Sequence, residues 1–115
     1  MKSMAMTALN ETMQQIEKEI NNNPEPISGI DANYKFVIDG EAYKLQLKDG
    51  KAELLSDAEV DADCTLKMSC DNFQKFLAGK LNGMTAFMTG KLKIDGDMTK
   101  ALKLESIVKK YEVDI

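Results

Sequence analysis

The amino-acid sequence predicts a single α+β domain over residues 1–115, and three patterns lead to that class. In the first twenty residues, apolar side chains recur every three or four positions, which indicates an amphipathic helix. Two Asp-Gly pairs then separate segments in which apolar and polar residues alternate, as in hairpins of half-buried strands. The second half mixes strand-like and helical segments, and 115 residues can enclose one hydrophobic core.

The first predicted element is a helix whose apolar stripe consists of Met6, Leu9, Met13, Ile16 and Ile20. The prolines of the following segment NNNPEP cannot continue a helix, so we expect it to end there. The stripe also fits barely two heptads of a coiled coil, but packing against the domain's own sheet is the preferred interpretation.

Three antiparallel strands are predicted next, over residues 33–39, 43–48 and 51–55. Asp39-Gly40 and Asp49-Gly50 are expected to form the two turns between them. Each strand carries one apolar and one polar face, which is typical of an antiparallel sheet that is covered on one side only.

Residues 56–63 are strongly acidic, which raises the alternative of a calcium-binding loop. An EF-hand loop that began at Asp57 would need glycine where Ala62 stands and glutamate where Met68 stands. The match fails at both positions, so a solvated acidic loop is the preferred interpretation.

Two further strands and three helical segments are predicted after this loop. The strands cover residues 64–68 and 91–94. A helix is expected to begin after Ser69 or Asp71, and a last helix, over residues 98–111, after Asp97, because these side chains cap helix N-termini. A short helical turn over residues 84–88 lies between them.

The residue inventory excludes several classes of function. The net charge is −4, but residues 1–66 hold 6 lysines and 13 acidic residues, whereas residues 67–115 hold 9 lysines and 6 acidic residues. Arginine is absent and aromatic residues are few, so we expect no nucleic-acid partner. Histidine, a P-loop and a Gly-x-Gly-x-x-Gly pattern are also absent, so the sequence predicts no enzyme activity, no cofactor and no metal.

The two cysteines, and the lack of recognisable targeting segments, indicate a reducing compartment. Cys64 and Cys70 have the spacing of neither a zinc pair nor a redox motif, and we expect them to be structural thiols. No apolar run approaches the roughly 20 residues of a membrane helix. The first residues also lack the apolar segment of a signal peptide, so a cytoplasmic location is expected.

The segment over residues 82–104 is unusually rich in soft apolar side chains. Met84, Phe87, Met88 and Met98 stand there among three glycines. For any one of these side chains, a place in the core is the preferred interpretation. Together they indicate movable apolar cover over the sheet, because methionine adapts to irregular shapes, and such cover can enclose a pocket for an apolar ligand.

Residues 61–104 resemble the sterol carrier protein 2 domain family. The matching motifs are the Ala-Asp-Cys-Thr strand at 62–65, Gly79-Lys80, Ala86-Phe87, the Gly-Lys-Leu-Lys-Ile segment at 90–94 and Gly-Asp-Met at 96–98. The resemblance extends less distinctively over residues 9–108. It departs at the C-terminus, since YEVDI is not the signal of peroxisomal members, and we expect the domain to act without an attached thiolase or dehydrogenase domain.

The resemblance implies a five-stranded sheet with helices packed over one face, enclosing an apolar cavity or tunnel. The implied ligand is a long-chain fatty acid, a fatty acyl-CoA or a sterol-like lipid, held by an intracellular carrier. The alternative is an accessory or dimerisation module that presents a lipid or isoprenoid substrate to a partner enzyme in trans. The predicted ligand set is Phe36, Leu45, Met68, Phe73, Phe76, Leu77, Leu81, Met84, Phe87, Met88, Leu92, Ile94, Met98 and Leu102.

Three lysines flank the glycine-bounded cover, namely Lys80, Lys91 and Lys93. A solvated surface is the preferred interpretation of these charges. The functional alternative is that they contact an anionic lipid head group or, transiently, an anionic membrane, where each lysine near the surface is worth roughly 1 kcal/mol.

Overall fold

Five strands form one mixed sheet, accompanied by four α-helices, in the part of the chain that the computed structural model describes, residues 2–55 and 61–111. Side chains are described from residue 11 onward. The strands are β1 (Ala32–Ile38), β2 (Glu41–Lys48), β3 (Lys51–Leu55), β4 (Cys64–Met68) and β5 (Lys93–Gly96). The helices are α1 (Lys2–Asn22), α2 (Cys70–Leu77), α3 (Gly83–Met88) and α4 (Met98–Val108). The predicted α+β class is confirmed.

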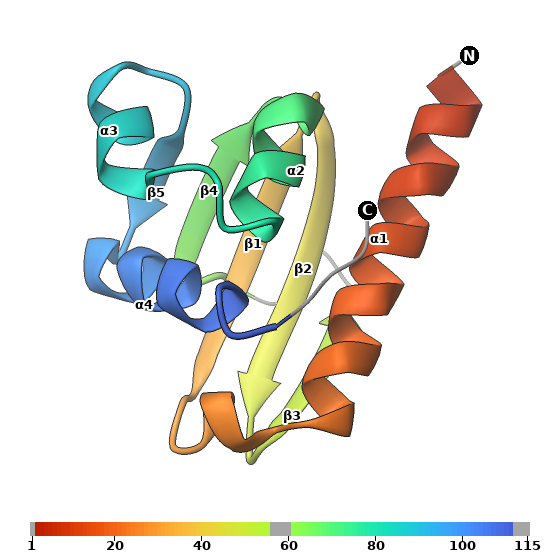
Figure 1. Cartoon of the computed structure of the whole chain (residues 1–115), viewed down its shortest axis with the longest axis vertical. Coiled ribbons are helices and arrows are strands. Elements are labelled where there is room, and N and C mark those ends of the chain that lie inside the picture. The colour runs from red at the N-terminus through yellow and green to blue at the C-terminus, as the bar shows by residue number, and fades with distance from the viewer. Residues whose placement is uncertain (1, 56–60, 112–115) are drawn as a thin grey trace.

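The strand order is β3-β2-β1-β4-β5, as Figure 1 shows. The meander β1-β2-β3 and the pair β4-β5 are antiparallel, whereas β1 and β4 run parallel. Both predicted Asp-Gly turns are confirmed: Asp39 and Asp49 have φ of 49° and 54°, and the glycine after each also has a positive φ. Positive φ at both central residues is the type I′ geometry, which matches the twist of a hairpin.

One face of the sheet is covered by helices and the other is open. Along β1, Tyr34, Phe36 and Ile38 are buried, while Lys35 and Val37 between them are partly exposed. Figure 1 shows α2 and α4 in front of the central strands, with α1 beside β3. The open face carries the polar residues of each strand, as the alternating pattern predicts.

Helix α1 packs against the sheet, as predicted, and also covers the edge of β3. Met13, Ile16 and Ile20 are buried. On the same helix, the Asn21 side chain accepts a hydrogen bond from the Ala52 N–H (2.8 Å) and donates one to the Ala52 carbonyl (2.9 Å). A Glu17 carboxylate oxygen accepts the next outward N–H of the strand, that of Leu54 (2.7 Å).

The fifth strand begins two residues later than predicted. It covers Lys93–Gly96 rather than residues 91–94. The N–H groups of Lys91 and Leu92 both donate to the carbonyl of Ala86 at 2.8 and 3.0 Å, so these residues close the end of α3 instead of joining the sheet.

The last helix is three residues shorter than predicted. It ends at Val108, and residues 109–111 form a turn that brings the Tyr111 hydroxyl to the Asn23 carbonyl (2.6 Å). Of the predicted acidic loop, residues 56–60 lie outside the described residues, as do residues 112–115 of the C-terminus.

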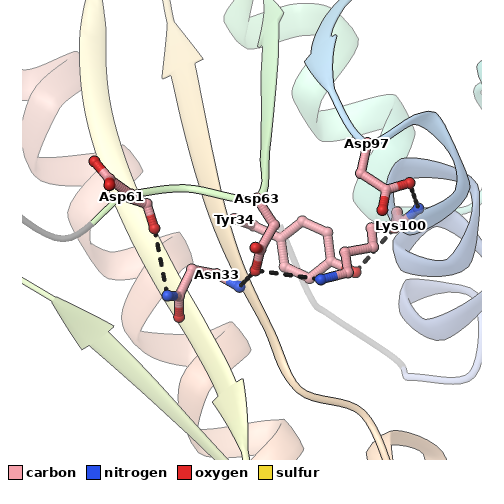
Figure 2. Close-up of polar contacts among 6 residues, drawn as sticks. All are labelled: Asn33, Tyr34, Asp61, Asp63, Asp97 and Lys100. Atoms are coloured by element: carbon pink, nitrogen blue, oxygen red, sulfur yellow. Dashed lines mark hydrogen bonds and ion pairs between the residues drawn. The ribbon is translucent and has the colours of Figure 1, made fainter.

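Asp63 joins the two halves of the sheet to α4 (Figure 2). Its N–H donates to the Asn33 carbonyl (2.8 Å), and its carboxylate accepts the Asn33 N–H (2.7 Å). The same carboxylate oxygen lies 3.5 Å from the Lys100 ammonium, and the Tyr34 hydroxyl donates to the Lys100 carbonyl (2.9 Å). Asp97 caps α4 through the Lys100 N–H (3.2 Å). These contacts fix α4 against the sheet.

Replacing Gly96 by alanine is expected to destabilise the fold severely. Gly96 has a φ of 99°, which is strained for alanine. A Cβ there would also lie 2.5 Å from the Asp63 carbonyl oxygen, so the clash with the backbone would destabilise the fold further. We expect a loss of at least about 2 kcal/mol in the free energy of unfolding, measured by urea denaturation.

Gly40→Ala is the matched control, since Gly40 has a φ of 86° but open space around the position of a Cβ. It should cost about 1 kcal/mol, which is the conformational strain alone. Equal losses in the free energy of unfolding for the two variants would show that the close approach of Gly96 to Asp63 does not contribute to stability.

Candidate functional site

The predicted ligand set divides into three groups in the structure. The largest group is buried in the core: Phe36, Leu45, Met68, Phe73, Phe76, Leu77 and Leu92. A second group is partly buried at its margin: Leu81, Ile94 and Met98. The remaining four side chains are exposed: Met84, Phe87, Met88 and Leu102. The set therefore comprises a packed apolar interior and a separate apolar surface.

The interior group includes the contact between α2 and the sheet. Ser69 caps this helix by accepting the Asn72 N–H (3.2 Å), which sets the turn on which Phe73, Phe76 and Leu77 point inward. The Phe73 ring lies 5.5 Å, centre to centre, from that of Phe36 on β1 in a tilted arrangement. This geometry is favourable for aromatic pairs and forms the apolar layer beneath the helices.

The exposed group, which we call the α3–α4 apolar surface, consists of Met84, Phe87, Met88 and Leu102. Met88 is 77 % exposed and Phe87 38 %. Helix α3 buries only Gly83 and Ala86, so its larger apolar side chains face solvent. Met84, Phe87 and Met88 have the i, i+3 and i+4 spacing of one helix face, and Leu102 lies on α4, to which α3 is hydrogen-bonded through Glu105. Exposed apolar patches mark places where a protein meets a ligand, a partner or a membrane.

Few contacts hold α3 in place. Asn82 caps it by accepting the Thr85 N–H (3.0 Å), and the Gly83 N–H donates to the Glu105 carboxylate of α4 (3.0 Å). Glu105 is also paired with Lys109 at 3.2 Å. Among the described elements, α3 has no extensive packing partner, which is typical of segments that open at low cost.

Two shallow grooves on the described surface are lined mostly by residues with polar or charged side chains. One lies between the 3-10 turn Glu25–Ile27 and the β2–β3 turn. The other, which we call the basic groove, has a volume of about 360 Å³. Its lining comprises Asp39, Gly40, Lys67, Met68, Ser69, Asn72, Gly90, Lys91 and Lys93.

The three lysines predicted to contact a head group are all exposed, but they are not all together. Lys91 and Lys93 line the basic groove, whereas Lys80 is not part of its lining. Lys67 joins them there, although the sequence gives no reason to single it out. It lies opposite Lys93 only because of the pairing register of β4 and β5, and no local pattern encodes that register.

The cysteines are poorly suited to nucleophilic chemistry. Cys64 is buried, and burial, followed by the negative charges of Asp97 and Asp63, raises the pKa of its thiol to about 11. Burial also raises the pKa of Cys70, as does the nearby Asp39. A thiol acts as a nucleophile through its thiolate, and these surroundings suppress it.

Neither a group of metal-ligating side chains nor a membrane-spanning helix is found among the described residues. Within residues 2–55 and 61–111, no three Cys, Asp or Glu side chains are grouped so that they could hold a metal ion. No helix in the same part of the chain has the length and apolarity needed to cross a bilayer.

Known proteins provide an independent comparison. The model of the SCP-2 sterol transfer family matches residues 9–109. Hydroxysteroid dehydrogenase-like protein 2 of Xenopus laevis is 39 % identical over 111 residues, which cover 93 % of this chain but 26 % of that protein. The chain thus spans about a quarter of the length of this relative.

Solved structures share the fold. The sterol carrier protein domain 2 of Helicoverpa armigera superposes with a TM-score of 0.71 at 26 % identity, covering 91 % of both chains. Sterol carrier protein 2 of Aedes aegypti, solved as a complex with the C16 fatty acid palmitate, has a TM-score of 0.63 at 24 % identity. That comparison covers 88 % of this chain and 97 % of the other.

Thiol modification is expected to be slow at Cys64 in the folded protein. A rise of the pKa from 9.0 to about 11 lowers the thiolate population at pH 8 by about 100-fold, and burial restricts access further. Reaction of the Cys70→Ser variant with a disulfide reagent measures Cys64 alone. The same variant in guanidinium chloride is the control. A folded-state rate equal to the unfolded rate would contradict the buried, protonated thiol.

Proposed function

The chain belongs to the SCP-2 sterol transfer family, and we propose that it binds one long-chain lipid and carries it. The ligand class is a fatty acid, a fatty acyl-CoA or a sterol-like lipid. The observation that carries the proposal is the α3–α4 apolar surface beside the apolar interior, on a fold whose Aedes aegypti representative was solved with palmitate. The residue assignments of the predicted ligand set remain part of this proposal.

The energetics of such a site suit a carrier. Burying a chain of about 16 carbons gains on the order of 12 kcal/mol at about 0.8 kcal/mol per methylene. Immobilising the ligand costs at least roughly 4 kcal/mol. The remainder corresponds to about micromolar affinity, which allows both loading and release.

We propose that α3 is the movable part of the site. It is short, its larger apolar side chains face solvent, and its hydrogen bond to α4 runs through one carboxylate, that of Glu105. Displacing α3 would uncover only its own buried residues, Gly83 and Ala86, so it would cost little packing. Met84, Phe87 and Met88 would then contact the incoming acyl chain instead of water.

A second proposal is that the domain is an accessory module that presents lipid to an enzyme. It is favoured by the match to hydroxysteroid dehydrogenase-like protein 2, because the chain matches only about a quarter of that protein and the rest of it lies outside the match. In either case we propose that the domain itself performs no catalysis, since both thiols have raised pKa values. Two free thiols also suit the cytoplasmic location that the sequence predicts.

We further propose that Lys80, Lys91 and Lys93 hold the protein transiently on an anionic membrane during loading. Residues 72–94 contain four lysines and no acidic residue, although the whole chain carries −4. This stretch includes α3, so its positive charges flank the apolar side chains that would meet the bilayer. The attraction acts over a Debye length of about 8 Å at physiological salt.

Palmitate uptake tests the carrier proposal. A fluorescent C16 fatty acid titrated into delipidated, folded protein should saturate at one ligand per chain with about micromolar affinity. The double variant Phe87→Gln/Met88→Gln should bind about tenfold more weakly, because two apolar contacts are lost.

Thr85→Gln on the same exposed helix is the control and should bind like the parent protein. Unfolding curves of all variants establish that they are folded. A flat titration of the parent would refute the carrier proposal. Unchanged affinity of the double variant would refute the role of α3.

Lipid transfer between vesicles tests the membrane contact. With phosphatidylglycerol in the vesicles, the transfer rate at low salt should exceed that with phosphatidylcholine alone, and it should fall as salt rises. Changing Lys80, Lys91 and Lys93 together to Gln should remove roughly 3 kcal/mol of attraction and most of this enhancement. Changing Lys18, Lys48 and Lys51, which are also exposed, should leave most of it. A rate that ignores lipid charge and salt would refute the contact.

A further inference from the structure

The basic groove contains a pair of opposed like charges. Lys67 on β4 and Lys93 on β5 are direct partners across the antiparallel ladder, and both are exposed. Like charges that face each other across a ladder are unfavourable. In the described part of the chain, no ion pair offsets either of them. The fold therefore keeps a local electrostatic cost at this position.

A third lysine and two polar residues complete the groove. The Lys91 backbone is fixed by its hydrogen bond to the Ala86 carbonyl (2.8 Å), so its side chain projects from a defined point beside the strand pair. Ser69 and Asn72, at the start of α2, line the same hollow. In Figure 1, β4 leads directly into α2 at this end of the sheet.

One carboxylate also lines the groove and has a backbone partner. Asp39 accepts the Cys70 N–H at 3.1 Å, which ties the β1–β2 turn to the start of α2. Its single negative charge stands against three lysines. The next acidic residues along the chain from α2 to β5 are Asp71 and Asp95, and neither lines the groove. The groove thus has an excess of positive charge.

We propose that the basic groove binds a phosphate monoester. Such a group carries about −1.5 to −2 charges and three strong acceptor oxygens, which match three ammonium groups better than a single carboxylate would. Binding would convert the repulsion between Lys67 and Lys93 into attraction to a shared anion. The monoester belongs either to a soluble metabolite or to a lipid head group such as that of phosphatidic acid. The site contains no residue of the α3–α4 apolar surface, and it goes beyond the proposed lipid carriage.

Titration with soluble phosphates tests the site without any acyl chain. Glycerol 3-phosphate and inorganic phosphate are added to ¹⁵N-labelled protein at constant ionic strength, with chloride as the reference anion. The expected result is a saturable shift of the amide signals of Ser69, Gly90, Lys91 and Lys93. Lys67→Gln should weaken the binding about tenfold, since one charge-assisted contact is lost.

Lys48→Gln/Lys51→Gln is the matched control. These two exposed lysines are also direct partners across a ladder, that of β2 and β3, but neither lines the basic groove. The control variant should bind glycerol 3-phosphate like the parent protein. Lys67→Gln should also unfold at the same temperature as the parent or higher, because it relieves a repulsion, and this separates a binding role from a structural one.

Vesicles separate the two sources of the group. Phosphatidylcholine vesicles with and without phosphatidic acid are tested against parent, Lys67→Gln and control variant. Saturable binding of glycerol 3-phosphate supports a soluble ligand. Binding only to phosphatidic acid vesicles, weakened by Lys67→Gln and not by the control variant, supports a head group. Shifts that do not saturate, together with vesicle binding that does not depend on phosphatidic acid, would overturn the proposal, as would equal losses in both variants. Palmitate uptake is measured separately, so failure of the carrier proposal is recognised independently.

Discussion

The parallel pairing of β1 with β4 is the constraint on which the rest of the molecule depends. The meander β1-β2-β3 is built from local hairpins, whereas β4 pairs with the opposite edge of β1 and brings α2, β5 and α4 with it. Asp63 secures this junction through two hydrogen bonds to Asn33 and an ion pair with Lys100. Gly96 can approach its carbonyl closely because it has no side chain, which brings β5 against β4. The basic groove follows from this pairing together with the register of β4 and β5.

Local patterns in the sequence predict most of the fold but only part of the candidate site. Alternation and Asp-Gly turns predict the meander, and the capping residues, Ser69 or Asp71 for α2 and Asp97 for α4, predict where these helices begin, because each signal acts within a few residues. The structure assigns the cap of α2 to Ser69. The register of β4 against β1 and β5 depends on residues far apart in the chain. Lys67 therefore could not be placed beside Lys93 from the sequence. Apolar composition likewise does not separate a buried Phe73 from an exposed Met88.

The molecule combines two kinds of surface. The α3–α4 apolar surface has no strong polar character, whereas the basic groove has no large apolar group except Met68, which is buried. Lys91 follows α3 by a few residues and lines the groove, so it connects the two. An amphiphile, with an acyl chain and a charged head, has the same division of chemistry as these two surfaces.

The contacts of α1 with β3 have a consequence for association between copies of the chain. An edge strand with free N–H and C=O groups is a template onto which another strand can add, and such addition leads to aggregation. The amide of Asn21 occupies both backbone groups of Ala52, and Glu17 occupies the N–H of Leu54. These side chains take the place that a neighbouring strand would fill. The helix thus prevents the addition of a further strand at that edge. It also contributes Met13, Ile16 and Ile20 to the core.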